Sequence, residues 1–212
     1  MHSADYTLYL VTDAPSSYPR GFLASIEAAI AGGVTIVQYR ADIADTKSKR
    51  ALYETALPLR DLLRRLNVPF IINDHVDLAL ALDADGVHVG QTDLPPAIVR
   101  KLIGPRKLLG LSATTRDEVL AADTSILDYL GLGPVFPTST KPDAAPATGL
   151  AALAALAALT PLPTVAIGGI TPDNAASVFA AGVDGIAVVT ALSRAPDPRA
   201  AAQTLRSAKT KK

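Results

Sequence analysis

An apolar strand runs directly into a polar loop in the stretch Leu130-Gly131-Leu132-Gly133-Pro134-Val135-Phe136-Pro137-Thr138-Ser139-Thr140-Lys141. Its glycines and prolines restrict the backbone, its hydroxyl groups can donate hydrogen bonds, and Lys141 adds a full positive charge. A loop of this composition can hold an anion, although Gly-Pro and Pro-Thr pairs are equally typical of an ordinary turn. The fold is decided by the recurrence of this order, because apolar strands followed by polar residues occur along the whole chain.

Eight apolar runs are predicted to be strands, each followed by a helix. The strands are expected at residues 6–13, 34–40, 68–74, 86–90, 107–112, the start of the stretch quoted above, 163–169 and 185–190. The helices are expected at residues 20–31, 46–66, 76–82, 94–103, 115–122, 150–159, from 171 onward, and in a last helix that ends near 208. The strands are apolar throughout, which is typical of parallel strands buried on both faces.

Eight strand–helix units predict an α/β fold, a closed (β/α)8 TIM barrel. We expect a single domain over residues 1–208, followed by a frayed basic tail at 209–212. A doubly wound open sheet is the main alternative. That fold normally has fewer strands, and no dinucleotide-type glycine spacing follows the first strand here.

Some helix starts carry specific signals. Thr115 and Glu118 have the spacing of a capping box, and Thr171 followed by Pro172 predicts an N-cap and a first-turn proline. In the helix at 150–159, leucine recurs every third residue among alanines, which predicts a packing stripe. The run is far too short to span a bilayer.

Composition excludes several classes of protein. The chain has 212 residues, 49% of them hydrophobic, and its 20 basic and 20 acidic side chains balance to a formal net charge of +0. Neither a nucleic acid nor a membrane surface is therefore predicted as a partner. The absence of cysteine excludes disulfides and thiolate metal sites. The first residues lack a basic region and a long apolar segment, so we expect a cytoplasmic protein.

Polar residues follow nearly every predicted strand. In a parallel barrel these positions converge on one rim, where active sites of such barrels lie. They are Gln38 and Arg40 after the second strand, Asn73 and Asp74 after the third, Ser112 after the fifth, Thr138 to Lys141 after the sixth, Gly168 and Gly169 after the seventh, and Thr190 after the eighth.

Two anion sites are expected on this rim. Gly168-Gly169, together with the hydroxyl and backbone amides where the last helical segment begins, has the character of the usual barrel phosphate site. Asp74 and Asp93 are oxygen donors of the kind that Mg²⁺ prefers, and Mg²⁺ commonly shares its ligands with phosphate and water. Arg40 and Lys141 would neutralise the rest of a diphosphate.

Each of these residues also has a purely structural interpretation. Asp74 and Asp93 could be helix caps, Ser112 could simply end a strand, and Gly168-Gly169 could be only a tight turn. Gln38 could be a satisfied polar group inside the barrel mouth. His88 is expected to be structural, because no nucleophile motif lies at a recognisable spacing from it.

With these residues assembled, the chain resembles the thiamine phosphate synthase family over nearly its whole length. Seven segments carry the resemblance in the family order. They are Leu8 to Asp13, Gln38-Tyr39-Arg40, Ile72-Asn73-Asp74, Asp85 to Gln91, Gly133 to Lys141, Ala166 to Ile170 and Val188 to Ala191. The resemblance implies that hydroxymethylpyrimidine diphosphate and hydroxyethylthiazole phosphate are joined to give thiamine phosphate and diphosphate.

The resemblance also implies a role for each site residue. Asp74 and Asp93 would hold Mg²⁺, and Ser112, Lys141 and Arg40 would act in catalysis. The residues expected to contact the pyrimidine diphosphate are Gln38, Arg40, Asn73, Ser112 and Lys141. Those expected to hold the thiazole phosphate are Thr138, Ser139, Thr140, Gly169, Val189 and Thr190. Small-molecule substrates are therefore the expected partners, with a homodimer as one option for the assembly.

One position departs from the family pattern. A lysine is usual near the diphosphate where this chain has Asp42, which would repel an anion unless its side chain points away. Lys47 or another cation could substitute, or the affinity for diphosphate could be lower.

Two alternatives to the synthase are considered: a related thiazole tautomerase, and a barrel that binds phosphate without turnover. Ser112, Lys141 and the Asp74/Asp93 pair favour the synthase, because a tautomerase binds no diphosphate.

Overall fold

Eight parallel strands close into a barrel in the computed structural model, which describes residues 4–40, 48–138 and 146–209. Each strand pairs with the next in sequence, and β1 also pairs with β8. The strands are β1 (Leu8–Val11), β2 (Ile36–Tyr39), β3 (Phe70–Asn73), β4 (Gly86–Val89), β5 (Leu108–Ala113), β6 (Tyr129–Leu132), β7 (Thr164–Ile167) and β8 (Gly185–Val188). The predicted TIM barrel is confirmed, and the open doubly wound sheet is excluded.

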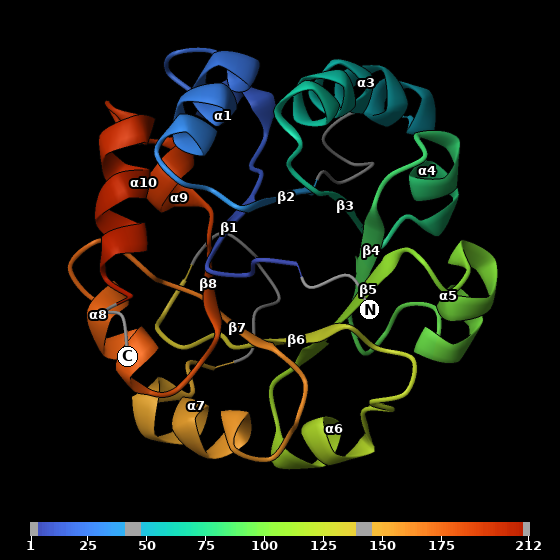
Figure 1. Ribbon diagram of the computed structural model, residues 1–212, viewed down its shortest axis with the longest axis vertical. Coiled ribbons are helices and arrows are strands. Elements are labelled where there is room, and N and C mark those ends of the chain that lie inside the picture. Colours follow the sequence, from blue (N-terminus) through green and yellow to red (C-terminus); the bar gives the residue numbers. More distant parts are fainter. Residues whose placement is uncertain (1–3, 41–47, 139–145, 210–212) are drawn as a thin grey trace.

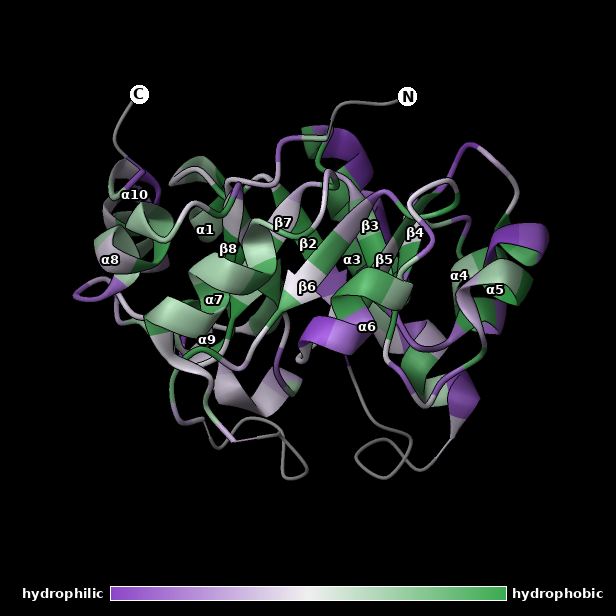
Figure 2. Ribbon diagram, turned by 90° about the horizontal axis from the view of Figure 1, so that it is seen from below, coloured by the Kyte–Doolittle hydropathy of each residue, from purple (hydrophilic) through white to green (hydrophobic). Residues whose placement is uncertain are grey.

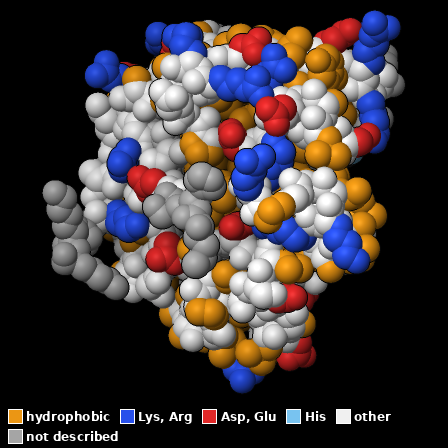
Figure 3. Space-filling model, turned by 45° about the vertical axis from the view of Figure 1, so that its right-hand side comes forward, with side chains coloured by type: hydrophobic (Ala, Val, Ile, Leu, Met, Phe, Trp, Pro, Cys, Tyr) orange, Lys and Arg blue, Asp and Glu red, His pale blue; other side chains and the backbone are white. Residues whose placement is uncertain are grey.

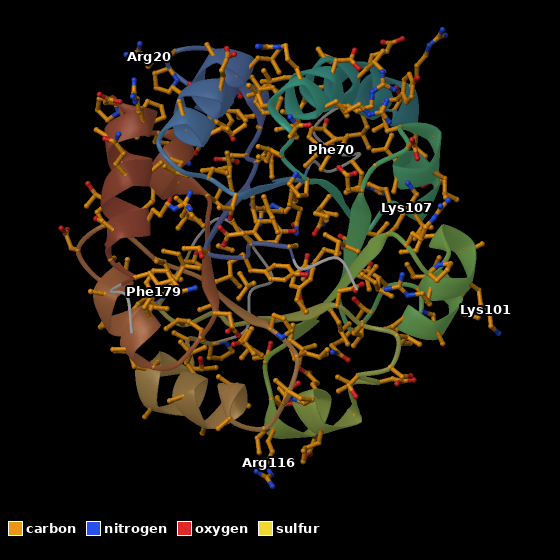
Figure 4. The ribbon with its side chains drawn as sticks, in the orientation of Figure 1. Arg20, Phe70, Lys101, Lys107, Arg116 and Phe179 are labelled. Atoms are coloured by element: carbon orange, nitrogen blue, oxygen red, sulfur yellow. The ribbon has the colours of Figure 1, made fainter. Side chains whose placement is uncertain are left out.

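Helices surround the barrel on its outside (Figure 1). They are the 3-10 turn η1 (Pro15–Ser17), α1 (Phe22–Ala31), α3 (Lys49–Leu66), α4 (Val76–Ala81), α5 (Pro96–Ile103), α6 (Arg116–Ala121), α7 (Gly149–Ala157), α8 (Ala175–Ala180), α9 (Thr190–Ser193) and α10 (Pro198–Ser207). In the stick view, the charged side chains of Lys101 on α5 and Arg116 on α6 point away from the barrel (Figure 4). Over the surface turned forward in Figure 3, basic and acidic side chains are interspersed, in keeping with the balanced charge.

The core has two layers, because successive strand side chains point to opposite faces. On β1, Leu8 and Leu10 pack outward against the helices, whereas Tyr9 and Val11 point into the barrel. The side view shows the apolar strands between more polar outer segments (Figure 2). The barrel interior is therefore a packed core of its own, and any polar side chain that points into it needs a partner there.

An aspartate stands directly before each of β4, β6 and β8. Each carboxylate accepts a hydrogen bond from the backbone amide at or near the start of the preceding strand. The pairs are Asp85 with Phe70, Asp128 with Leu109 and Asp184 with Thr164, each at 2.8 Å. These repeated contacts stabilise the end of the barrel that lies opposite the strand carboxyl ends.

One predicted helix start is confirmed and another is wrong. Thr115 Oγ1 accepts from the Glu118 amide at 3.2 Å, and the Glu118 carboxylate accepts in return from the Thr115 amide, which completes the capping box of α6. Thr171 is not the N-cap of the next helix, because α8 begins only at Ala175. The Asn174 side chain instead accepts from the Thr171 amide at 2.9 Å and closes a turn before the helix.

The two ends of the described part of the chain lie at the same end of the barrel (Figure 2). The predicted frayed tail starts at Lys209, yet the ammonium group of this residue donates to the Asp184 carbonyl oxygen at 2.6 Å. The first residue of the tail is thus anchored, and residues 210–212 lie outside the described part of the chain.

Candidate active site

The carboxyl ends of all eight strands lie at one end of the barrel, because every pair of strands is parallel. Gln38 lies in β2, Asn73 ends β3 and Ser112 lies in β5. Thr190 is the first residue of α9, and the other described candidates lie in the segments that follow a strand. Five residues named from the sequence lie outside the described residues: Asp42, Lys47, Ser139, Thr140 and Lys141.

Asp74 takes a backbone conformation that is uncommon for a residue other than glycine, with φ of 59°. Its amide donates to the His88 carbonyl oxygen at 2.8 Å, and the Asn73 side-chain amide donates to its carboxylate at 2.6 Å. Asp74 does not cap α4, whose N-cap is His75. Backbone strain at a strand end is typical of functional positions, and the Asn73 contact orients the carboxylate.

Arg40 is held at the end of β2 by the Thr12 hydroxyl, which accepts from its amide at 3.0 Å and donates to its carbonyl oxygen at 3.2 Å. Burial lowers the pKa of the Arg40 guanidinium, and the carboxylates of Asp13 and Asp74 oppose this shift. The cation therefore lies partly buried beside two carboxylates. Because water screens a partly buried charge little, this cation interacts strongly with nearby charges, which would include those of an anionic ligand.

Asp93 lies in the loop after β4, the neighbour of β3. Its Oδ2 accepts from the Gly90 amide at 2.7 Å, and it does not cap α5, whose N-cap is Pro95. Among the described residues, no three His, Cys, Asp or Glu side chains lie close enough to hold a metal by themselves. Asp74 and Asp93 fit a Mg²⁺ ion only as two oxygen donors, with phosphate and water completing its ligands.

A chain of hydrogen bonds crosses the interior of the barrel. Gln38 Nε2 donates to the Tyr9 hydroxyl at 3.0 Å, and the Tyr9 and Tyr129 hydroxyls lie 2.8 Å apart. Tyr129 continues to His88 Nδ1 at 2.9 Å, and His88 Nε2 lies 2.8 Å from the Ser112 hydroxyl oxygen. The two predicted pyrimidine contacts, on β2 and β5, are therefore connected through buried side chains.

Glycines make room for this chain. A Cβ atom on Gly110 would lie 2.2 Å from the Tyr129 ring and 2.5 Å from His88 Nδ1. On Gly131 it would lie 3.1 Å from the His88 ring. The crossing of Tyr129 and His88 thus requires a residue without a side chain on β5.

The loop after β6 lies against the turn after β7. The Val135 amide donates to the Ile167 carbonyl oxygen at 2.9 Å, and the Phe136 amide donates to the Gly168 carbonyl oxygen at 3.1 Å. Gly169 has φ of 62°, and a Cβ atom there would lie 2.7 Å from Phe136 Cβ. These contacts hold the residues just before Thr138 beside the two glycines.

The second part of the expected phosphate site follows β8. Val189 is the N-cap of the single-turn helix α9, which begins at Thr190. The first amides of a helix lack acceptors within it and carry a partial positive charge. Asn174 fixes the neighbouring turn, because its side chain donates to the Gly169 carbonyl oxygen at 3.0 Å.

The sequence interpretation missed Tyr9 and Tyr129 and treated His88 only as structural. Two of these side chains stand between two aliphatic residues in a strand, in Leu8-Tyr9-Leu10 and Val87-His88-Val89, whereas Tyr129 begins β6 between Asp128 and Leu130. Strand alternation in a barrel places the middle residue of such a triplet inside when its neighbours face the helices. That signal could have placed Tyr9 and His88 in the interior, but neither Tyr129 nor the contacts among the three.

Comparisons with known proteins agree on one family. The family model described as "Thiamine monophosphate synthase" matches residues 8–192. The chain belongs to the thiamine monophosphate synthase family. It is 56% identical to a thiamine-phosphate synthase of Chloroflexus aurantiacus, over 97% of this chain and 94% of that one. The corresponding protein of Laribacter hongkongensis is 54% identical, over 95% and 94% of the two chains.

A solved structure of this family has the same fold. The thiamine phosphate pyrophosphorylase of Pyrococcus furiosus superposes with a TM-score of 0.84 at 38% identity, covering 97% of this chain and 96% of that one. The family predicted from the sequence is thus confirmed. Among the described helices, none is both long and apolar enough to cross a membrane. The cytoplasmic location and the homodimer stay predictions.

Proposed function

We infer that this chain is a thiamine-phosphate synthase, a transferase that joins hydroxymethylpyrimidine diphosphate to hydroxyethylthiazole phosphate. The observation that carries this conclusion is the 56% identity to the Chloroflexus aurantiacus synthase over 97% of the chain. In the reaction, the bond from the pyrimidine methylene carbon to the diphosphate oxygen breaks. A bond from the thiazole nitrogen to that carbon then forms, and diphosphate is released.

The pyrimidine diphosphate is proposed to bind over β2, β3 and β5. Gln38 and Ser112 would contact the ring, and Arg40, Asn73 and Lys141 would contact the diphosphate. In a dissociative substitution the diphosphate leaves first, so negative charge develops on the leaving group. Arg40 supports this role, because it is a partly buried cation at a strand end. No general base is needed, since the attacking thiazole nitrogen already has a lone pair.

Asp74 and Asp93 are the proposed holders of Mg²⁺. When bound there, the ion would neutralise part of the charge on the departing diphosphate. The proposal is supported by the contacts from the Asn73 and Gly90 amides, because groups that orient carboxylates are common around metal ligands.

The thiazole phosphate is proposed to bind between the loop after β6 and the ends of β7 and β8. Gly169 would let the backbone approach the phosphate closely, and the amides at Val189 and Thr190 would donate to it. Hydroxyl groups of Thr138, Ser139 and Thr140 would complete the site. With both ligands in place, catalysis consists mainly of aligning the thiazole nitrogen with the methylene carbon.

The test is to mix the purified protein with both substrates and Mg²⁺ and to follow thiamine phosphate by mass spectrometry. We expect product only when both substrates are present. A Ser112→Ala variant should be slower by on the order of a hundredfold. Ser125→Ala, which removes a hydroxyl from the loop between α6 and β6, should retain the native rate. Absence of product from the native protein under all these conditions would overturn the assignment.

An Asp42→Lys variant belongs in the same experiment, because Asp42 replaces a usual lysine of the family. Product from the native chain would show that Asp42 is compatible with turnover. Product from the variant alone would identify a barrel that binds its ligands without catalysis. A Lys47→Ala variant then tests whether Lys47 substitutes for the missing cation: normal diphosphate affinity would exclude that role.

A further inference from the structure

We propose that Tyr9, Tyr129 and His88 are positioning residues, which fix whether Gln38 and Ser112 donate or accept a hydrogen bond toward a ligand. They thereby select an aminopyrimidine over an oxopyrimidine. The proposal deepens the proposed function and rests on it for the identity of the ligand. It concerns residues that need not touch the ligand themselves, since they act through the two side chains at the ends of the buried chain.

Burial makes the chain of hydrogen bonds obligatory. Tyr9 and Tyr129 are each 1% exposed, Gln38 is 5% exposed and His88 is 8% exposed. A buried hydroxyl or ring N–H that loses its partner costs about 1–3 kcal/mol, so every donor along the chain should find an acceptor. The hydrogen atoms must therefore be arranged in one consistent direction.

The donor-to-acceptor direction of this hydrogen-bond chain starts at Gln38. Its Nε2 donates to the Tyr9 hydroxyl, so the Tyr9 hydrogen is left to donate to Tyr129. The Tyr129 hydrogen then donates to His88 Nδ1, which must be the unprotonated ring nitrogen. His88 accordingly carries its hydrogen on Nε2 and donates to the Ser112 oxygen.

The two residues at the ends of the hydrogen-bond chain therefore offer opposite groups to a ligand, a donor at one end and an acceptor at the other. Ser112 accepts from His88, so its own hydrogen is available to donate to a ligand. Gln38 turns its nitrogen toward Tyr9, which leaves its carbonyl oxygen as an acceptor. Reversing either end requires reversing every bond between them, including a flip of the buried Gln38 amide.

An aminopyrimidine matches this pair of groups. It carries an exocyclic amine, which donates, beside a ring nitrogen, which accepts. The oxopyrimidine has the opposite pattern, because its exocyclic oxygen accepts and its ring N–H donates. Binding it would either leave buried groups unpaired or reverse the whole chain, and both cost free energy.

The close packing around the chain supports a positioning role. The absence of a side chain at Gly110 is what allows Tyr129 to reach His88. The Tyr6 ring packs against the Tyr129 ring, with ring centroids 4.9 Å apart and ring planes tilted by 38°. The hydroxyl of Tyr6 takes no part in the chain, so Tyr6→Phe is a matched control for the other tyrosines.

The first test determines the donor-to-acceptor direction of the buried hydrogen-bond chain, and it needs no substrate. The protein has only three histidines, so nitrogen NMR can resolve the tautomer of His88. We expect a single tautomer with the hydrogen on Nε2 in the native protein and in Tyr6→Phe. A hydrogen on Nδ1, or a mixture of tautomers in the native protein, would overturn the proposed direction.

The second test measures selectivity. The ratio of kcat/KM for the aminopyrimidine diphosphate to that for its oxo analogue should fall at least about tenfold in Tyr129→Phe. Tyr6→Phe should keep the native ratio. An unchanged ratio in a folded Tyr129→Phe protein would overturn the proposal. If that variant does not fold, Tyr9→Phe breaks the next bond of the chain and should have the same effect.

A failure of the proposed function can be told apart from a failure of this inference. If no thiamine phosphate forms, the selectivity is measured instead as the ratio of calorimetric dissociation constants for the two free pyrimidines. A native preference for the amino form that Tyr129→Phe removes supports the positioning role even without turnover. Equal binding of both forms by the native protein contradicts it.

Discussion

The Nε2 atom of His88, on β4, lies 2.8 Å from the hydroxyl oxygen of Ser112 on the neighbouring strand β5. This contact joins a residue expected to touch substrate to a buried chain that ends at Gln38, on β2. The interior of this barrel is therefore not a purely apolar core. It contains a polar path whose geometry depends on the small residues around it, and the first prediction follows from that dependence.

Gly110→Ala should destabilise the protein and disrupt the buried chain. The added Cβ would lie 2.2 Å from the Tyr129 ring and 2.5 Å from His88 Nδ1, closer than atoms can approach. Overpacking of this kind typically costs about 1–3 kcal/mol, measured as a lower midpoint of urea unfolding. Gly131→Ala is the control, because its Cβ would meet the His88 ring at 3.1 Å and should cost less. Equal stability of the two variants would contradict this account.

Asp128→Asn should weaken the end of the barrel away from the site. The Asp128 carboxylate accepts from the Leu109 amide at 2.8 Å and from the Arg100 guanidinium at 2.7 Å. The Arg100 side chain is 16% exposed, so removing its counter-charge should cost about 1.5–3 kcal/mol of unfolding free energy.

The exposed pair of Arg50 and Glu54 provides the control for this change. Their side chains are 87% and 63% exposed, and Glu54→Gln should cost less than about 1 kcal/mol. Urea unfolding of both variants with the native protein separates the two cases. A smaller loss for Asp128→Asn than for Glu54→Gln would contradict the role of the aspartate before β6.

The barrel could be predicted from the sequence because each strand is an apolar run that ends in polar residues. The capping box at Thr115 is a local pattern and could be predicted for the same reason. Thr171 was assigned the wrong role, because a Thr-Pro pair can precede a turn as well as a helix. The Asn174 side chain, three residues later, accepts from the Thr171 backbone amide and closes a turn, and α8 begins only after that turn.

Contacts across the barrel interior could not be predicted. The chain from Gln38 to Ser112 joins residues that are up to 120 positions apart in sequence, as in the Tyr9–Tyr129 contact. Alternation can place each side chain inside, but the register of the closed sheet decides which hydroxyl meets which ring nitrogen. The alternative interpretation of Asp74 and Asp93 as helix caps could not be decided from the sequence either. In the structure the N-caps are His75 for α4 and Pro95 for α5, so each helix begins later than that interpretation required.

Stability should fall at alkaline pH. Burial raises the pKa of Tyr39 to about 12 and the pKa of Tyr9 and Tyr129 further, whereas an unfolded tyrosine ionises near pH 10. Below about pH 10 both states keep these protons, so the tyrosines leave the free energy of unfolding unchanged. Above it the unfolded state releases protons that the folded state retains, and the folded state loses stability.

Urea unfolding at a series of pH values measures this slope. Tyr39→Phe should remain folded and should show a shallower decline above about pH 10, because one of the groups with a raised pKa is gone. Phenolate absorbance should rise together with the loss of helical circular dichroism. Reversible ionisation of Tyr39 near pH 10 in the folded protein would contradict the prediction.

Asp93→Asn should raise the Mg²⁺ concentration needed for half-maximal activity, if the two aspartates hold the ion as proposed. Asparagine keeps an oxygen that can accept from the Gly90 amide, so the loop should retain its shape while one negative charge is lost. The loss of a carboxylate ligand should weaken Mg²⁺ binding by on the order of tenfold to a hundredfold.

Asp77→Asn is the matched control, because Asp77 is an exposed acid on α4 that pairs with Lys49. A Mg²⁺ dependence that shifts equally in both variants would show that general surface charge is responsible. A shift in Asp93→Asn alone, with the native rate recovered at high Mg²⁺, is the expected result.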